Sequence, residues 1–381
     1  MFLKKFFKNI FCSGAGDYHL IITFFVLIFL GLAILASASY FIGEQQFGDP
    51  FYFLKRQLLR GVLPGLILFF LFSFIDYKNL RKIAFPLFVL ALLLLIAVFI
   101  PGIGEEREGV RRWITIGFSF QSSEIAKIFF IIYLSAWLAK NKKEIKKFKE
   151  VFLPFLIFLG LISCLIILQP DFGTLIVFIL TGMIIYFLAG AAWHHLIILM
   201  SLSIPGFYFL IKIAPYRLNR LLTFFNPLAA DPSGTGYHLN QAILAISSGG
   251  LWGRGLGYST QKVSSLPQVL SDSIFAVMAE EFGFIQMLAI VGLYLFLFYR
   301  IFLLAQKTDF LFGRLLAGGI GFLFIFQAIV NMGAMLGLLP LTGIPLPLIG
   351  YGSTNFVVFC LAFGILVNIS RQTNFYQKTL R

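Results

Sequence analysis

The chain has 381 residues, of which 59% are hydrophobic and 12% are charged, and its formal net charge is +14. This composition excludes a large soluble domain and is typical of a protein with many membrane spans. Nucleic acid is not an expected partner, because no basic stretch is interleaved with aromatic residues on a soluble fold. The three cysteines, Cys12, Cys164 and Cys360, are far apart and form no CxxC motif, so the sequence indicates neither a zinc site nor a disulfide framework.

Apolar segments follow one another along almost the whole chain. A membrane-spanning helix needs about 20 apolar residues, and the run at residues 20–36 is long enough to be a retained first span rather than a signal peptide. The sequence therefore predicts an all-α, polytopic membrane protein that forms a single domain over residues 1–381. About ten transmembrane helices are expected, near residues 18–40, 58–75, 83–100, 122–139, 151–168, 173–190, 194–214, 282–304, 312–337 and 346–369.

The distribution of basic residues predicts the orientation of these helices. Cytoplasmic loops, which face anionic membrane lipids, are enriched in Lys and Arg. Five basic clusters fall on one side if the N-terminus (residues 1–17) and the tail (residues 372–381) are both cytoplasmic. Residues 215–272, between the seventh and eighth helices, are then a large extracytoplasmic loop. Some cations nevertheless fall on the opposite, extracytoplasmic side, where binding of an anionic partner would explain them. They are Lys55, Arg56, Arg111, Arg112, Arg217 and Arg220.

Two oppositely charged residues stand at the start of the predicted fourth helix. Glu124 and Lys127 are three residues apart and would share one helix face. Charges at membrane depth are costly and usually face a partner or a wet cavity. The pair is therefore either a structural ion pair that fixes helix packing or part of a substrate-binding wall.

The loop before this helix carries an arginine pair, Arg111 and Arg112. Guanidinium groups present fixed forks of hydrogen-bond donors that suit a diphosphate. The pair is a candidate substrate clamp, and contact with lipid headgroups is the alternative interpretation.

The stretch at residues 216–281 cannot lie in lipid as one simple helix, because Gly, Pro, Ser and Asn residues interrupt it along its length. Arg217 and Arg220 would share one face if their segment is helical. The segment WGRGLGYSTQK, which ends at Lys262, is rich in glycine and would allow close approach of the backbone to a phosphate. Together these features favour an anionic ligand that carries phosphate.

Asp272 stands where the chain re-enters apolar sequence. It is either the N-cap of the next helix or a general base or metal-binding carboxylate that faces a cavity. Glu280 and Glu281 lie about two turns further along this helix. At least one of them is expected to face the protein interior, since exposure of a carboxylate to lipid is costly.

Several motifs occur in an order that resembles the SEDS family (shape, elongation, division, sporulation), which includes FtsW, RodA and SpoVE. The segment GVRRWITIGFSFQSSEIAK is similar to the family's GARRW…QPSE.AK element, ILQPDFGT to its QPDxGT turn, and SDSIFAVMAEEFGF to TDFIFAVIGEELGF. GYHLNQAILAISSGGLWGRGLGYSTQK and GIPLPLIGYGSTN are similar to two further family elements. The resemblance covers about residues 15–371, and the sequence of the GLGYSTQK segment is closer to FtsW than to RodA.

This resemblance implies a peptidoglycan glycosyltransferase that polymerises lipid II on the outer face of the bacterial cytoplasmic membrane, for cell division or for maintenance of cell shape. The implied partners are the undecaprenyl-diphosphate-linked substrate, a class B penicillin-binding protein and other proteins of the divisome or elongasome. The family's outer-face aspartate falls on Asp272, and its fourth-helix Glu and Lys fall on Glu124 and Lys127. The chain departs from the family at Gln268 and Leu270, which replace a carboxylate and a histidine.

The implied reaction is an inverting glycosyl transfer. The 4-hydroxyl of the acceptor's GlcNAc attacks C1 of the donor's MurNAc, and undecaprenyl diphosphate leaves. Asp272 would take the hydroxyl proton or hold a divalent cation, Mg²⁺ or Mn²⁺, although the sequence makes no cofactor certain. The candidate groups for stabilising the leaving-group charge are Arg111, Arg112, Arg217, Arg220 and Lys262. A lipid II flippase and a non-catalytic scaffold for the transpeptidase are the two alternative functions.

Overall fold

The computed structural model describes residues 16–107, 109–213, 218, 224–225, 235–260, 262 and 266–373. Each of the ten predicted apolar segments is a helix in this part of the chain. Seven helices are long and apolar enough to cross a membrane, and two further apolar helices, Ala84–Ala97 and Phe172–Leu188, are shorter. The prediction of a helical, polytopic integral membrane protein is therefore confirmed.

In chain order, the helices and the short 3₁₀ and π segments (η) between them are α2 (Tyr18–Phe47), α3 (Tyr52–Gln57), η1 (Leu58–Val62), α4 (Leu63–Phe74), η2 (Tyr77–Arg81), α5 (Ala84–Ala97), α6 (Ser122–Lys140), η3 (Lys142–Glu144), η4 (Phe148–Phe152), α7 (Leu153–Leu168), α8 (Phe172–Leu188), α9 (Trp193–Ile213), α11 (Thr235–Ser248), α13 (Ile274–Lys307), α14 (Leu311–Met335) and α15 (Ser353–Gln372).

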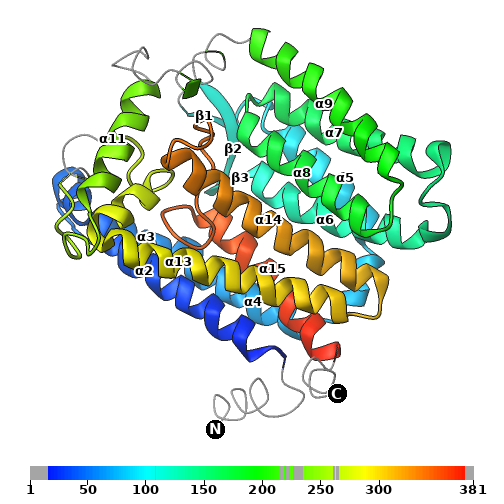
Figure 1. Ribbon diagram of the computed structural model, residues 1–381, viewed down its shortest axis with the longest axis horizontal. Coiled ribbons are helices and arrows are strands. Elements are labelled where there is room, and N and C mark those ends of the chain that lie inside the picture. Colours follow the sequence, from blue (N-terminus) through cyan, green and yellow to red (C-terminus); the bar gives the residue numbers. More distant parts are fainter. Residues whose placement is uncertain are drawn as a thin grey trace.

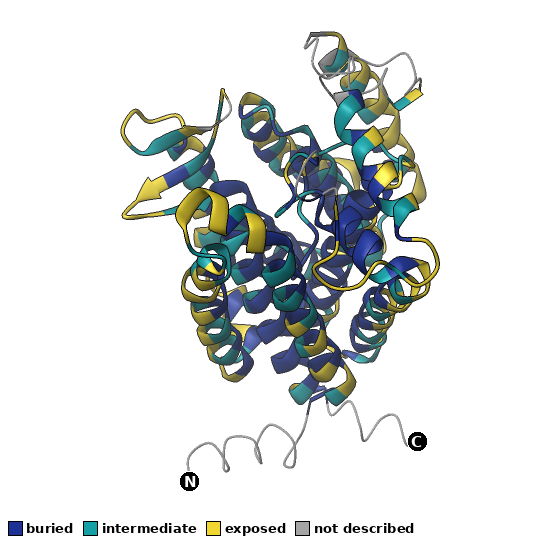
Figure 2. Cartoon of the chain, turned by 90° about the vertical axis from the view of Figure 1, so that its left-hand side faces the viewer, coloured by how far each residue is buried: buried dark blue, intermediate teal, exposed yellow. Residues whose placement is uncertain are grey.

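Helix α14 lies between two groups of helices (Figure 1). On one side it packs against α13, which in turn contacts α2 and α11, and on the other side it packs against α6 and α8. Helix α15 runs along α4 and also contacts α6. Buried residues gather along the centre of the bundle, and the outward-facing apolar side chains are exposed, as expected for surfaces that face lipid (Figure 2).

The first and last spans meet at one end of the bundle, which we call the Asp17 end. Asp17 is the N-cap of α2, because its side chain accepts hydrogen bonds from the backbone N–H groups of His19 and Leu20. The same carboxylate pairs with Arg300 of α13 at 2.6 Å, and the backbone N–H of Asp17 donates to Ser370 of α15 at 3.1 Å. Helices α2, α13 and α15 therefore share this end, and Asp272 lies at the opposite end, which we call the Asp272 end.

Several predicted helix boundaries differ from the structure near the Asp272 end. The first helix was predicted to end at residue 40 but continues to Phe47, and α3 (Tyr52–Gln57) is helical before the predicted start at residue 58. The predicted helix at residues 282–304 begins earlier, at Ile274, and a break at Gly283 (φ 76°, ψ 177°) separates a short first part from the long span. The helix predicted at residues 346–369 begins later, at Ser353. Residues 345–352 form a loop instead, because Pro345, Pro347 and the positive φ of Gly350 interrupt helical geometry.

The loop predicted at residues 101–121 contains a three-stranded antiparallel sheet, which was not expected from the sequence. Its strands are β1 (Gly104–Arg107), β2 (Val110–Ile116) and β3 (Phe118–Gln121). Apolar and polar residues alternate in the segment VRRWITIGFSFQ, which is the period of a half-buried strand. The turn between β2 and β3 is made at Gly117, whose φ of 72° suits glycine.

Candidate functional site

Asp272 is half-buried in the turn that precedes α13. The side-chain N–H₂ of Asn331, on α14, donates to the backbone carbonyl of Asp272 at 2.9 Å and to that of Ile344 at 2.8 Å. The backbone N–H of Tyr351 donates to the carbonyl of Leu270 at 2.6 Å. Helix α14 and the loop at residues 336–352 thus fix the backbone that carries Asp272.

The helix that follows Asp272 is α13, which begins at Ile274. Ser273 occupies the N-cap position, without a side-chain capping bond. Its hydroxyl donates to the carbonyl of Pro267 at 2.7 Å and contacts Nε2 of His238, on α11, at 2.6 Å. Because the serine proton is committed to Pro267, His238 carries its proton on Nε2 and donates it to Ser273. Ser273, and not Asp272, is therefore the N-cap residue of α13.

A buried polar network lies inside the bundle next to the loop at residues 345–352. Lys127 pairs with Glu124 at 2.8 Å, and both side chains are only 3% exposed. The Lys127 ammonium also donates to Gln327 of α14 at 3.0 Å, and Asn355 of α15 donates to Glu124 at 2.8 Å. The predicted pair exists, and it joins α6, α14 and α15. Its predicted role in substrate binding stays a prediction.

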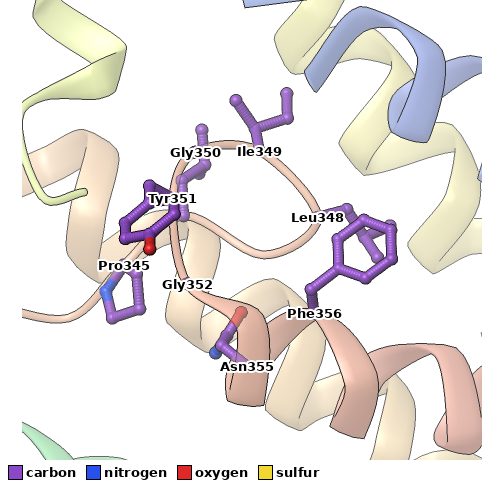
Figure 3. A pocket seen from close by; sticks show the side chains of 9 residues that line it. Pro345, Leu348, Ile349, Gly350, Tyr351, Gly352, Asn355 and Phe356 are labelled. Atoms are coloured by element: carbon purple, nitrogen blue, oxygen red, sulfur yellow. The ribbon is translucent and has the colours of Figure 1, made fainter. Parts of the chain in front are cut away.

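A small cavity lies between the loop at residues 345–352 and the start of α15, and Asn355 of the polar network lines it. Its volume is about 10 Å³, and its lining residues include Pro345, Tyr351, Asn355 and Phe356 (Figure 3). This is about the space of one water molecule. Because Asn355 also binds Glu124, the cavity connects the loop next to Asp272 with the buried ion pair.

A larger pocket, of about 230 Å³, lies on α3 and η1 and is lined by Tyr52, Lys55, Arg56, Leu59 and Arg60. We call it the cationic pocket. Lys55 reaches out to Asp49 at 2.8 Å, and this hydrogen bond lowers the pKa of the Asp49 carboxyl. Arg56 donates to the Tyr52 hydroxyl at 3.2 Å. Three cations and one nearby carboxylate make this a place for an anion.

The cationic pocket is connected to the Asp272 region through α15 and the loop before it. The ring of Phe53, on α3, lies edge-on to Tyr351 at 5.4 Å between centroids, and Ser353 donates to the buried Gln57 at 3.2 Å. Lys55 and Arg56 stood out in the sequence only as exceptions to the charge rule. Their grouping with Arg60 follows from the helical spacing of residues 55, 56, 59 and 60, a signal that the sequence contains and that could have revealed the pocket.

The glycine-rich segment approaches the protein backbone closely in the structure. Gly253 crosses Gly283 so closely that a Cβ on Gly283 would lie 2.1 Å from the nitrogen of Gly253. Backbone N–H groups of Arg254 and Gly255 donate to the carbonyls of Glu280 and Glu281 at 3.0 and 2.9 Å. We call this crossing the glycine clasp.

Two buried carboxylates hold the segment that follows the clasp, where the sequence predicted at least one facing inward. Glu280 accepts hydrogen bonds from Ser259 and Thr260 and pairs with Arg254 at 3.3 Å. Glu281 pairs with Lys262 at 2.7 Å. The Lys262 ammonium also lies 3.2 Å from the Ser37 hydroxyl of α2, so its charge is neutralised inside the protein.

The predicted arginine clamp is divided between two places. Arg111 pairs with Glu106 at 3.2 Å on the exposed sheet. Arg112 donates to the backbone carbonyls of Gln169 and Pro170, in the turn between α7 and α8. Neighbouring residues of a strand point to opposite faces, so the two guanidinium groups do not converge. Arg217 and Arg220 lie outside the described residues.

The described residues contain no group of three or more His, Cys, Asp or Glu side chains that could hold a metal ion. Binding of Mg²⁺ or Mn²⁺ at Asp272 stays a prediction from the sequence.

Comparison with known proteins gives consistent matches over nearly the whole chain. The profile of the cell cycle protein family of FtsW, RodA and SpoVE matches residues 18–375. The chain is 38% identical over 365 residues to the probable peptidoglycan glycosyltransferase FtsW of Coxiella burnetii, covering 95% of this chain and 98% of that protein. It is 37% identical over 360 residues to the stage V sporulation protein E of Bacillus subtilis, with 94% and 98% covered.

Solved structures show the same fold. A chain of a peptidoglycan synthase complex, described for its coordination of polymerization and crosslinking, matches with a TM-score of 0.77 at 27% identity, covering 94% of this chain and 98% of that chain. The rod shape determining protein RodA of Thermus thermophilus matches with a TM-score of 0.68 at 28% identity, covering 94% and 97%.

Proposed function

The chain belongs to the FtsW, RodA and SpoVE family of cell cycle proteins, and we propose that, as a peptidoglycan glycosyltransferase, it polymerises lipid II at its Asp272 end. The observation that carries this proposal is the position of Asp272. Its backbone is fixed by Asn331, and its carboxylate lies beside Gly343 of the neighbouring loop, where a Cβ on the glycine would come 3.4 Å from Oδ2. A carboxylate held in this way can accept a proton from a substrate hydroxyl.

In the proposed reaction, the Asp272 carboxylate accepts the proton of the acceptor's GlcNAc 4-hydroxyl as the oxygen attacks C1 of the donor's MurNAc. The new C1–O bond forms while the bond from C1 to the diphosphate oxygen breaks. The bonding electrons leave with undecaprenyl diphosphate, which gains negative charge. Cations placed where this charge develops lower the barrier. The cationic pocket, with Lys55, Arg56 and Arg60, is the described group of side chains that best fits this role.

We also propose that the Asp272 end faces the outside of the bacterial cytoplasmic membrane, with both termini in the cytoplasm. The basic clusters of the sequence support this orientation. The match to a chain of a peptidoglycan synthase complex supports a class B penicillin-binding protein as the partner.

The function is tested with the purified chain in liposomes that contain lipid II, alone and with a class B penicillin-binding protein. We expect glycan polymers to form. Movement of lipid II between leaflets without polymer would indicate a flippase instead. Binding of the transpeptidase with neither polymer nor transport would indicate a scaffold.

The cationic pocket gives a separate prediction. Replacing Arg56 with alanine removes a charged hydrogen-bond donor, which contributes about 1.5–3 kcal/mol in typical sites. We therefore expect kcat/KM for lipid II to fall about tenfold or more. Lys78→Ala, which removes an exposed cation at the Asp17 end, is the control and should change little. Equal losses in both variants would mean that the pocket does not bind the diphosphate.

A further inference from the structure

The tip of the β2–β3 hairpin has one apolar and one polar face, whereas further from the tip Arg112 lies on the first face and Trp113 on the second. Ile114 pairs with Phe120, and Ile116 pairs with Phe118, so these four side chains lie on one face. On the other face, the hydroxyls of Thr115 and Ser119 donate to Glu105. The tip of this hairpin, outside the helix bundle, therefore separates apolar from polar side chains as an amphipathic element does.

The apolar face is covered by protein at one end only. Ile114 is buried, whereas Ile116 is 61% exposed and Phe118 is 64% exposed. These two residues flank Gly117, so the exposed apolar surface lies at the tip of the β2–β3 hairpin. In Figure 2 the exposed strand extends sideways from the bundle, at the end away from the marked chain ends.

The helix that leads into the sheet is too short to cross a bilayer. Helix α5 has 14 residues, which gives a length of about 21 Å, against a hydrocarbon thickness of about 30 Å. It begins near the Asp17 end, because Tyr77, just before it, donates its backbone N–H to Asn368 of α15. Its far end, from which the chain leads into the sheet, therefore points toward the Asp272 end.

The apolar surface of α5 continues directly into the sheet. Phe99 and Ile100, just past the helix, are exposed. The backbone N–H of Gly104 donates to Ile100 at 3.0 Å, and that of Thr115 donates to Ile103 at 3.0 Å. These hydrogen bonds tie the sheet to the end of a lipid-facing helix, so the exposed apolar face is continuous with the membrane-facing surface.

We propose that the β2–β3 hairpin is a membrane-surface anchor, with Ile116 and Phe118 inserted at the boundary between headgroups and acyl chains on the Asp272 side. Strand edges carry unpaired backbone groups that cannot lie in hydrocarbon, so the sheet stays at the interface and its polar face meets water. Helix α6 begins directly after β3, and the anchor therefore sets the depth of the helix that carries Glu124 and Lys127.

Site-directed spin labelling of the full chain in lipid nanodiscs tests this anchor. The three cysteines are replaced by alanine, and Phe118→Cys is labelled. The matched control is Thr115→Cys, which is exposed on the polar face of the same hairpin. We expect a several-fold higher ratio of oxygen to nickel-chelate accessibility at position 118 than at position 115.

Two outcomes would overturn the proposal. Equal accessibility to the nickel chelate at both positions would place the tip in water. Shielding of position 118 only after a penicillin-binding protein is added would make the tip a protein-docking surface. If the cysteine-free chain does not fold, Phe118→Trp in the native chain replaces it, and brominated lipids should then quench more tryptophan fluorescence than in the parent protein.

Discussion

Replacing Asp272 with asparagine should reduce lipid II polymerisation by about 10²–10⁴-fold, because the amide cannot accept the hydroxyl proton. The two side chains have nearly the same shape, and the contacts that fix this residue use its backbone carbonyl, which the variant keeps. Folding and the thermal unfolding midpoint should therefore change little. Product length and rate are measured by gel separation of labelled glycan made by the purified protein with its transpeptidase.

The control is Asp49→Asn, which changes another carboxylate of the Asp272 end, one that pairs with Lys55. We expect it to retain most of the activity. Full polymerisation by Asp272→Asn would remove Asp272 from the mechanism. Loss of activity together with a large fall in the unfolding midpoint would instead assign Asp272 a structural role.

Replacing Lys262 with methionine should destabilise the protein by about 3–5 kcal/mol, because it leaves Glu281 buried without its cation. The two side chains are 5% and 0% exposed. The double variant Lys262→Met with Glu281→Gln removes both charges and should recover much of this loss. Unfolding in mixed micelles measures the three stabilities.

Activity of the double variant decides what Lys262 does. Recovery of polymerisation along with stability would make Lys262 a structural residue, whereas a stable but inactive double variant would support its predicted contact with substrate. Lys147→Met is the matched control, since Lys147 pairs with Glu144 on the surface, where both side chains are about half exposed. Its loss should stay below about 1 kcal/mol.

The sequence was sufficient for the parts of the fold that depend on local pattern. Apolar runs of span length located the helices, and a spacing of three residues placed Glu124 beside Lys127. The sheet was missed although its alternating pattern is present, because it lies between two strongly apolar segments. The predicted membrane span began only at residue 282 because residues 274–281 include Glu280 and Glu281, and the burial of these two carboxylates depends on partners in residues 254–262.

The site depends on contacts between distant segments, which no local pattern encodes. Asn331 reaches Asp272 across 59 positions, and Arg112 reaches Gln169 across 57. Two adjacent arginines, Arg111 and Arg112, suggested a clamp for a diphosphate. Successive side chains of a β-strand point to opposite faces, so the two guanidinium groups are directed apart. The ion pair of Lys262 with Glu281 could not be predicted from the sequence, because the two residues are 19 positions apart and lie on different elements.

The glycine clasp also limits how a lipid substrate can enter. At the crossing of Gly253 and Gly283 no side chain separates the two backbones, and backbone hydrogen bonds join the segment at residues 250–255 to the break in α13. Residues 250–255 and the break in α13 are therefore held in direct backbone contact. Under the proposed function, the prenyl chain of the substrate would have to enter the bundle at another place.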